Sequence, residues 1–463
     1  MKELKEYSFN IQIKTIACYN GKNEILRWGD FMNVQTLLSK GDIQCHCGRT
    51  HHCDTKTLLV ADNVYCRIPN LLEGIDHVMV ISDGNTRPLC GEKVIETLTD
   101  AGITVDEAYF DQTEVLVPDE KAIAYAERFV KEETRVIIGV GSGVINDLSK
   151  YIAYEHGIPS MIVATAPSMD GFASAGAVMF LKGLKVTCQR RAPRWIVADK
   201  AVLANAPIDM IRSGIGDIMG KYSALSDWKL AYLLSEEPMC DMIYEMVETE
   251  LNACADNIDA IMQRNPSAIG RLMESLAIVG IALAYQGSSR PASGSEHLIS
   301  HYFELQGVKN HEPYFPHGID VGYASIVSEI LRKRIADENP DDFQFDFNKA
   351  HWTEEIKRCF GDTADEIETL QEKNKTFEID RSTYIRNHWK EIKAMLDQTP
   401  GVEFICGKLK DAGYDIHTFV DTYGMNKIRD AVCYATDIKT RYTLLQLLRD
   451  TGYLEKYAKE LKL

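Results

Sequence analysis

The sequence has few of the features that would place it in a membrane, outside the cell or on nucleic acid. Its apolar runs are too short to span a bilayer, and the first residues, MKELKEYSFN, lack the apolar core of a signal peptide. The 12 cysteines are scattered through 463 residues, so reduced thiols and a cytoplasmic location are expected. A net charge of -17 opposes non-specific binding to nucleic acid and to anionic membranes, and no membrane insertion is expected.

Low-complexity tracts and internal repeats are also absent, and the 45% hydrophobic content is typical of a folded protein with a large core. Between residues 60 and 200, short β-branched runs alternate with helical patterns, which predicts a parallel sheet with helical crossovers. The strand-like runs are HVMVISD (77–83), RVIIGVGSG (135–143) and SMIVATAPS (160–168).

After Pro207 the apolar residues recur with helical spacing to the end of the chain. We therefore predict an α/β fold in two parts. An N-terminal α/β domain with a parallel sheet occupies residues 1–205, and an all-α C-terminal domain occupies residues 206–463.

Residues 45–53 read CHCGRTHHC, a group dense enough to bind a soft metal. The spacing differs from a standard zinc finger, because one residue separates Cys45 from Cys47 and no second cysteine pair follows at finger spacing. A metal knuckle and an exposed polar loop both remain open. The group comprises Cys45, His46, Cys47, His51, His52 and Cys53.

Two glycine-containing motifs follow predicted strands. GVGSGVIND (139–147) opens a helix, where free N–H groups could bind a pyrophosphate, although the spacing differs from the full dinucleotide fingerprint. TAPSMDGFAS (165–174) offers hydroxyls and a carboxylate at the carboxyl end of the next strand, where open parallel sheets bind ligands. A tight turn without a ligand is the alternative for each motif.

The segment GIGDIMGKYSALSDW (214–228) contains Asp217, which we predict in the first turn of a helix. The helix dipole favours a carboxylate there, so Asp217 is either a helix cap or a ligand.

Three histidines form the most specific pattern. His297 and His301 in SGSEHLISH are four residues apart on a predicted helix, so both imidazoles project from one face. His317 in PHGIDVG starts another predicted helix after Pro316. Two imidazoles and one carboxylate form a set that suits a catalytic divalent metal.

In this order, GSGVIND, TAPSMDGFAS, GIGDIMGK, SGSEHLISH and PHGIDVG resemble the sn-glycerol-1-phosphate dehydrogenase family. This family lies in the superfamily of glycerol dehydrogenase, iron-containing alcohol dehydrogenases and dehydroquinate synthase. The resemblance covers about residues 75–330 and implies a dehydroquinate synthase-like fold, with a metal meeting the nicotinamide between the two domains. The CHCGRTHHC segment and the long C-terminal tail depart from the minimal family pattern.

The resemblance also implies roles for individual residues. Asp217, His297 and His317 would bind one divalent metal, Zn²⁺ first and Ni²⁺ or Fe²⁺ as alternatives. Asp170 and His301 would be the catalytic residues facing the substrate. The residues expected to bind NAD or NADP are Asp83, Gly141, Gly143, Asp147, Thr165, Ser168 and Ser174.

The implied reaction is the reversible NAD(P)-dependent reduction of dihydroxyacetone phosphate to sn-glycerol 1-phosphate. The substrate phosphate needs local positive charge, for which Lys221 and Arg290 are the candidates. A homo-oligomer is expected. A dehydrogenase of an unphosphorylated polyol such as glycerol, and a dehydroquinate synthase-like cyclase that recycles its NAD, remain alternatives. A regulatory protein that has lost catalysis is disfavoured by the intact Asp217, His297 and His317 set.

Overall fold

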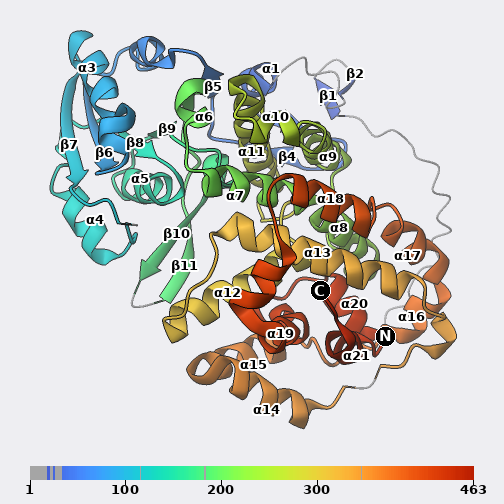
Figure 1. Ribbon diagram of the computed structural model, residues 1–463. Coiled ribbons are helices and arrows are strands. Elements are labelled where there is room, and N and C mark those ends of the chain that lie inside the picture. The colour runs from blue at the N-terminus through green and yellow to red at the C-terminus, as the bar shows by residue number, and fades with distance from the viewer. Residues whose placement is uncertain (1–17, 21–23, 27–33, 115, 182–183, 346) are drawn as a thin grey trace.

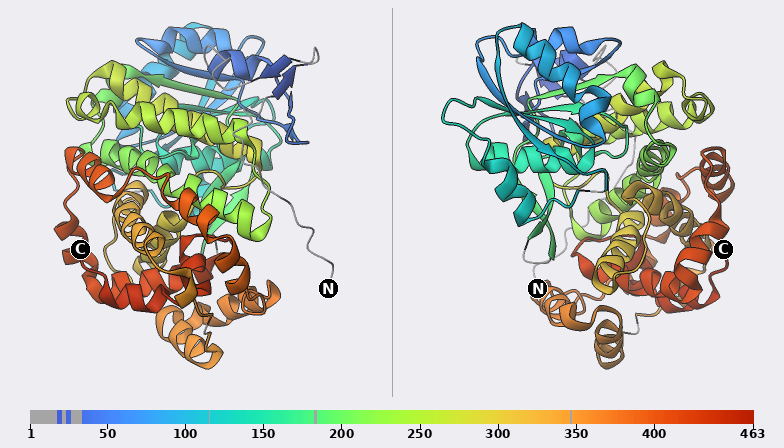
Figure 2. Two further views of the ribbon diagram at one scale, coloured as in Figure 1. Left: turned by 90° about the vertical axis from the view of Figure 1, so that its right-hand side faces the viewer. Right: turned by 60° about the vertical axis from the view of Figure 1, so that its left-hand side comes forward.

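A six-stranded parallel sheet with helices on both faces is followed by a large helical region (Figure 1). The structure, a computed structural model, describes residues 18–20, 24–26, 34–114, 116–181, 184–345 and 347–463. Figure 2 shows the sheet and its helices at one end of the molecule and the C-terminal helices at the other.

The strand order in the sheet is β5-β12-β9-β8-β6-β7, and all neighbours are parallel. The central strands are buried along nearly their whole length because helices cover both faces. The three predicted strand runs are confirmed as β6, β8 and β9. The strands are β5 (Thr57–Ala61), β6 (His77–Asp83), β7 (Thr104–Phe110), β8 (Val136–Gly141), β9 (Ser160–Ala164) and β12 (Trp195–Asp199).

The chain changes direction across the sheet between β6 and β8. The chain passes from β6 to β7 on one side and then returns to β8 on the other side of β6. In open parallel sheets, the carboxyl ends of the strands at such a reversal form a ligand-binding crevice. The covering helices are η2 (Val64–Arg67), α2 (Ile68–Leu71) and α3 (Glu92–Asp100) on one face, and α4 (Glu120–Glu127) and α5 (Gly143–Glu155) on the other.

Among the described residues, three small antiparallel hairpins were not part of the predicted alternation of strands and helices. The hairpin β10-β11 follows β9 and packs against α5. The other two lie near the N-terminus, where α1 (Val34–Ser39) packs against β5. The hairpin strands are β1 (Cys18–Asn20), β2 (Glu24–Leu26), β3 (Ile43–Gln44), β4 (Thr50–His51), β10 (Gly176–Leu181) and β11 (Leu184–Gln189).

From α6 onward the named elements in the described part of the chain are helices, which confirms the predicted all-α region. The principal helices are α6 (Lys200–Ala204), α7 (Ile208–Met219), α8 (Lys221–Ser235), α9 (Asp241–Ala255), α10 (Ile258–Met262), α11 (Pro266–Gln286), α12 (Ser295–Asn310), α13 (His317–Ala336), α14 (Lys349–Phe360), α15 (Ala364–Lys373), α16 (Ser382–Asn387), α17 (Trp389–Leu396), α18 (Val402–Asp411), α19 (Ile416–Tyr434), α20 (Leu444–Asp450) and α21 (Leu454–Glu460).

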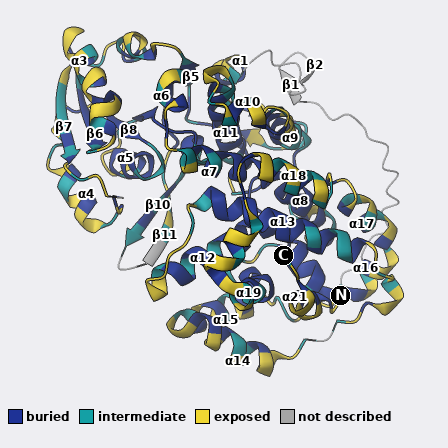
Figure 3. Ribbon diagram, in the orientation of Figure 1, coloured by how far each residue is buried: buried dark blue, intermediate teal, exposed yellow. Residues whose placement is uncertain are grey.

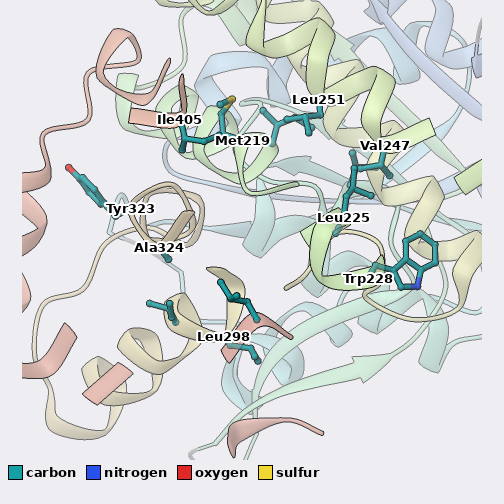
Figure 4. Packing of buried hydrophobic residues seen from close by; sticks show 14 of the residues in the cluster. Met219, Leu225, Trp228, Val247, Leu251, Leu298, Tyr323, Ala324 and Ile405 are labelled. Carbon is teal, nitrogen blue, oxygen red and sulfur yellow. The ribbon is translucent and has the colours of Figure 1, made fainter. Parts of the chain in front are cut away.

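One apolar core runs from the sheet into the helices. Ile196 of β12 and Leu276 of α11 belong to the same buried cluster, and Figure 4 shows Leu225 and Trp228 of α8 near Val247 of α9 within it. Because this core crosses the junction between α6 and α7, the division after residue 205 stays a prediction.

Helix α11 has 21 residues, and its most apolar 18-residue stretch has a mean hydropathy of 1.5. By length and composition alone, this helix could cross a membrane. However, 67% of this stretch is buried inside the protein, as expected of a core helix (Figure 3).

Candidate active site

Three helices bring together the carboxylate and imidazoles that the sequence proposes as metal ligands. Asp217 comes from α7, His297 from α12, and His317 is the first residue of α13 (Figure 1). Their donor atoms all lie within 4.8 Å of one another, and His297 Nε2 is 3.5 Å from Asp217 Oδ1. The ring of His301 lies 5.5 Å from that of His317. The three proposed metal ligands and His301 therefore lie close together.

Close contact between α7 and α13 depends on glycines at their crossing. A Cβ atom on Gly216 would lie 2.1 Å from the Gly318 carbonyl oxygen, and one on Gly318 would lie 1.9 Å from the Ser213 carbonyl oxygen. Larger residues would push the two helices apart. These glycines thus allow Asp217 and His317 to approach each other.

Asp217 lies in the last turn of α7, so the prediction that it occupies the first turn of a helix was wrong. The helix already begins at Ile208, directly after Pro207. At this end the helix dipole disfavours a carboxylate. Lys221 Nζ compensates by donating to Asp217 Oδ1 at 2.6 Å, and the Asp170 backbone N–H donates to Oδ2 at 2.8 Å.

The buried carboxyl of Asp217 stays ionised. Burial alone would raise its pKa, but the Lys221 ammonium holds the pKa below its usual range. Each oxygen can accept more than one bond, so Asp217 can also bind a cation beside the histidines.

Two glutamates that sequence reasoning missed orient the histidines. His297 Nδ1 lies 2.7 Å from Glu296 Oε1, and His317 Nδ1 lies 2.8 Å from Glu304 Oε1. An Nδ1–H donated to a carboxylate leaves Nε2 as the free electron-pair donor, which is the arrangement common at metal-binding histidines. The donor set and its carboxylate partners therefore fit a divalent metal ion.

Lys221 lies between two acidic residues instead of at an open surface. Its Nζ is 2.7 Å from Asp170 Oδ2 as well as 2.6 Å from Asp217 Oδ1, and its side chain is fully buried. Burial would lower the pKa of Lys221, but Asp170 and Asp217 together raise it, so the ammonium remains charged. Because these carboxylates balance its charge, the expectation that Lys221 binds the substrate phosphate is not carried forward.

Arg290 is likewise occupied within the protein. Its side chain is fully buried and forms an ion pair with Glu237, with Nε 3.0 Å from Oε1. Its Nη2 also donates to the Tyr442 carbonyl oxygen at 2.6 Å. A guanidinium enclosed in this way offers no exposed edge to a phosphate, so the expectation for Arg290 is also withdrawn.

Several of the predicted nucleotide-binding residues lie at the carboxyl ends of the central strands. Gly141 ends β8 and Gly143 begins α5, while Asp83 ends the neighbouring strand β6 at the reversal of the sheet. Asp83 Oδ1 accepts the backbone N–H of Thr86 at 2.9 Å. Asp147 instead lies within α5 and faces the hairpin β10-β11. Its Oδ2 accepts the Val178 N–H at 3.0 Å, so Asp147 links α5 to β10.

The loop after β9 forms hydrogen bonds both with the turn between β8 and α5 and with helix α7. Thr165 donates its N–H to the Gly141 carbonyl at 3.0 Å, and the hydroxyls of Ser168 and Ser142 lie 2.6 Å apart. Ser213 of α7 then donates to the Ser168 carbonyl at 2.8 Å. Further along the loop, the Ser174 hydroxyl donates to the Gly171 carbonyl at 3.0 Å. The expected nucleotide loops and the helix carrying Asp217 therefore form one connected unit.

The fold and the donor set define a protein of the iron-containing alcohol dehydrogenase class. The family model of iron-containing alcohol dehydrogenase matches residues 60–207. The crystal structure of glycerol dehydrogenase from Schizosaccharomyces pombe shares the fold, with a TM-score of 0.54, 16% sequence identity, and coverage of 88% of this chain and 90% of that chain. An alcohol dehydrogenase from Oenococcus oeni gives a TM-score of 0.55 at 13% identity, covering 86% and 97%.

Curated relatives narrow this class to one family. The glycerol-1-phosphate dehydrogenase [NAD(P)+] of Halalkalibacterium halodurans is 34% identical over 306 residues, which are 65% of this chain and 77% of the relative. The enzyme of the same name from Bacillus licheniformis is 36% identical over 63% of this chain and 74% of the relative, and that of Methanococcoides burtonii 31% over 58% and 73%. The chain belongs to the glycerol-1-phosphate dehydrogenase family.

Proposed function

We propose that the protein reduces dihydroxyacetone phosphate to sn-glycerol 1-phosphate with NADH or NADPH, and catalyses the reverse reaction, with the help of a divalent metal. The observation that carries this proposal is the convergence of Asp217, His297 and His317 within 4.8 Å. Membership of the glycerol-1-phosphate dehydrogenase family supports the phosphorylated substrate and the nucleotide.

Asp217, His297 and His317 would hold the metal, with Zn²⁺ the first expectation and Ni²⁺ or Fe²⁺ as alternatives that imidazole ligands also suit. When bound, the metal supplies Lewis acidity at the substrate carbonyl oxygen, and the nicotinamide supplies the hydride. Glu296 and Glu304 keep the two imidazoles in the orientation that metal binding requires.

His301 and Asp170 would act on the substrate directly. Burial lowers the pKa of His301 well below its usual range, and the charge of Lys439 adds to this effect. The imidazole of His301 is therefore neutral, and it would relay a proton from solvent: one ring nitrogen accepts a proton from water while the N–H of the other gives its proton to the carbonyl oxygen. The carbonyl carbon gains the hydride in the same reduction, which yields the secondary alcohol. Asp170, whose carboxylate is held by Lys221, would accept a hydrogen bond from a substrate hydroxyl.

The nucleotide would lie at the reversal of the sheet between β6 and β8. The position of Asp83 and Gly141 at adjacent strand ends supports this proposal, as does the turn into α5 at Gly143. Thr165, Ser168 and Ser174 would line the side of the nucleotide that faces the metal.

Lys439 is our candidate for the substrate phosphate in place of Lys221 and Arg290. It directly follows η7 (Ala435–Ile438), which packs against α12, and its charge acts on His301. Replacing Lys439 with Met should raise KM for dihydroxyacetone phosphate at least tenfold, about the effect of losing one charge-assisted hydrogen bond. Lys349→Met, at an exposed pair with Glu372, is the control. Equal KM values in both variants would exclude Lys439.

Oxidation of NADH and NADPH by the metal-loaded protein, measured with dihydroxyacetone phosphate and separately with dihydroxyacetone, tests the proposed function. Turnover with the phosphate alone is expected. Turnover with dihydroxyacetone alone would indicate a dehydrogenase of an unphosphorylated polyol. Absence of nucleotide oxidation with both substrates would contradict the proposal and favour the cyclase alternative. His297→Ala should abolish turnover and lower metal content while its circular dichroism spectrum remains unchanged.

A further inference from the structure

A second group of potential metal ligands lies outside the candidate active site. The loop between β3 and β4 carries Cys45 and Cys47, and His51 ends β4. These residues meet Cys240, which directly precedes α9. The four donor atoms all lie within 4.8 Å of one another. About 190 residues of chain separate Cys240 from the loop, so the complete set is visible only in the folded protein.

The distances between the donor atoms match a tetrahedral site. The sulfurs of Cys45 and Cys240 are 3.6 Å apart, and His51 Nε2 lies 3.4 Å from the sulfurs of both Cys47 and Cys240. Zinc bonds of about 2.3 Å to sulfur and about 2.0 Å to nitrogen give edges of roughly 3.8 Å and 3.5 Å, respectively, in a tetrahedron. The observed group is therefore already close to the size that such an ion requires.

The local backbone directs the loop ligands toward one point. Gly48 has a φ of 81°, and its N–H donates to the Cys45 carbonyl at 3.0 Å. Cys45 in turn donates its own N–H to the Arg49 carbonyl at 3.0 Å, which closes the hairpin around the turn. A left-handed glycine makes this tight turn without strain, and the turn keeps Cys45 and Cys47 close to His51.

His51 has the orientation of a metal ligand. Its Nδ1 lies 2.9 Å from the Tyr285 carbonyl oxygen, near the end of α11. A carbonyl can only accept a hydrogen bond, so Nδ1 carries the proton and Nε2 presents its electron pair to the sulfurs. Arg49 secures the same hairpin by donating to the Gln286 carbonyl at 2.7 Å.

We propose that Cys45, Cys47, His51 and Cys240 bind a structural zinc ion that joins the N-terminal hairpin to the helical region. Four protein ligands close the coordination shell, which distinguishes a structural site from the His2Asp set with its open positions. His51 and Cys240 are buried, so the ion is shielded from solvent on the helical side. The other potential ligands of the CHCGRTHHC segment are not among these four donors. His52 pairs with Asp42 on the surface, and His46 Nδ1 lies 3.8 Å from the Cys45 sulfur.

A disulfide or a simple cluster of thiols explains these contacts less completely. A bond between Cys45 and Cys240 would use two of the sulfurs and give no role to Cys47 or to the fixed tautomer of His51. A divalent cation stabilises the three thiolates together and uses all four donors.

The metal content of the full-length protein tests the proposal separately from its enzymatic function. Wild-type protein should contain one zinc equivalent per chain that survives the His297→Ala substitution and is lost in Cys240→Ser. Cys254→Ser, which alters a buried cysteine within α9, is the matched control and should retain this zinc. The melting temperature should fall more in Cys240→Ser than in Cys254→Ser, because loss of the metal frees the hairpin from the helices.

Cobalt substitution tests the proposal in the wild-type protein, so its main result does not depend on whether a variant folds. Cobalt-loaded wild-type protein should show an intense near-ultraviolet band from charge transfer between thiolate and Co²⁺, which the His2Asp set cannot produce because it lacks sulfur. The band should persist in His297→Ala. Absence of the thiolate band, or a Cys45–Cys240 disulfide found by mass spectrometry of the native protein, would overturn the proposal whether or not the enzyme reduces dihydroxyacetone phosphate.

Discussion

Replacing Glu296 with Gln should weaken metal binding at the candidate active site without removing any metal ligand. Glu296 is fully buried, and its Oε1 lies 2.7 Å from His297 Nδ1 and accepts the Gly294 N–H at 2.8 Å. Glutamine has the same shape and keeps a carbonyl oxygen as acceptor. The substitution therefore removes the negative charge behind the imidazole and leaves the packing intact.

The magnitude follows from this change in charge. Burial would raise the pKa of Glu296, but its bond with His297 holds the pKa below the usual range, so the wild-type residue is a carboxylate. A carboxylate behind a metal-binding imidazole increases its basicity, and loss of such a partner typically lowers metal affinity about 10- to 100-fold. This corresponds to roughly 1.4 to 2.8 kcal/mol of binding free energy.

Competition between apo-protein and a chromophoric chelator measures the affinity directly. Glu250→Gln is the control, because Glu250 is also buried and its partners are Ser275 and Arg271. We expect weaker binding in Glu296→Gln and unchanged binding in the control at the active-site metal. Equal affinity in wild type and Glu296→Gln would refute the role assigned to the charge of Glu296.

Three further substitutions test other parts of the account. His301→Asn should lower kcat about 10²- to 10⁴-fold through loss of proton transfer, while metal content measured by mass spectrometry stays constant. Gly318→Ala should lower the melting temperature and the metal affinity, because its Cβ would lie 1.9 Å from the Ser213 carbonyl oxygen, and overpacking typically costs about 1–3 kcal/mol; an unchanged melting curve would contradict this. Burial raises the pKa of Asp450 from 3.8 to about 6, so the folded state holds the extra proton and loses stability as pH rises through this interval. The free energy of unfolding of Asp450→Asn should therefore rise by up to roughly 3 kcal/mol relative to that of wild type between about pH 4 and 6. Denaturant unfolding at several pH values measures this difference.

Local sequence patterns correctly predicted the elements whose residues form an unbroken run or a regular spacing along the chain. The apolar run 77–83 matches β6, and the spacing of His297 and His301 correctly placed both on one helix. Charge compensation could not be predicted in the same way. Lys221 is one helical turn from Asp217, yet its second partner, Asp170, lies in a loop that reaches it only in the folded protein.

The same limit applies to the remaining differences. Arg290 was a reasonable phosphate candidate by residue type, but its partner Glu237 is 53 positions away and could not be identified without the fold. Likewise, the segment 45–53 contains three of the four proposed zinc ligands, whereas the fourth, Cys240, lies far from it in the sequence. Sequence patterns therefore identified residues able to bind ligands, and the long-range contacts decided which partners each residue has.

The stereochemistry of the product tests the central claim most directly. After complete oxidation of NADH with dihydroxyacetone phosphate, the product can be incubated with NAD and a dehydrogenase specific for sn-glycerol 3-phosphate. The account predicts one glycerol phosphate per NADH consumed and no oxidation by the second enzyme, because the product is sn-glycerol 1-phosphate. Full oxidation of the product by that enzyme would contradict the assignment to glycerol-1-phosphate dehydrogenase activity.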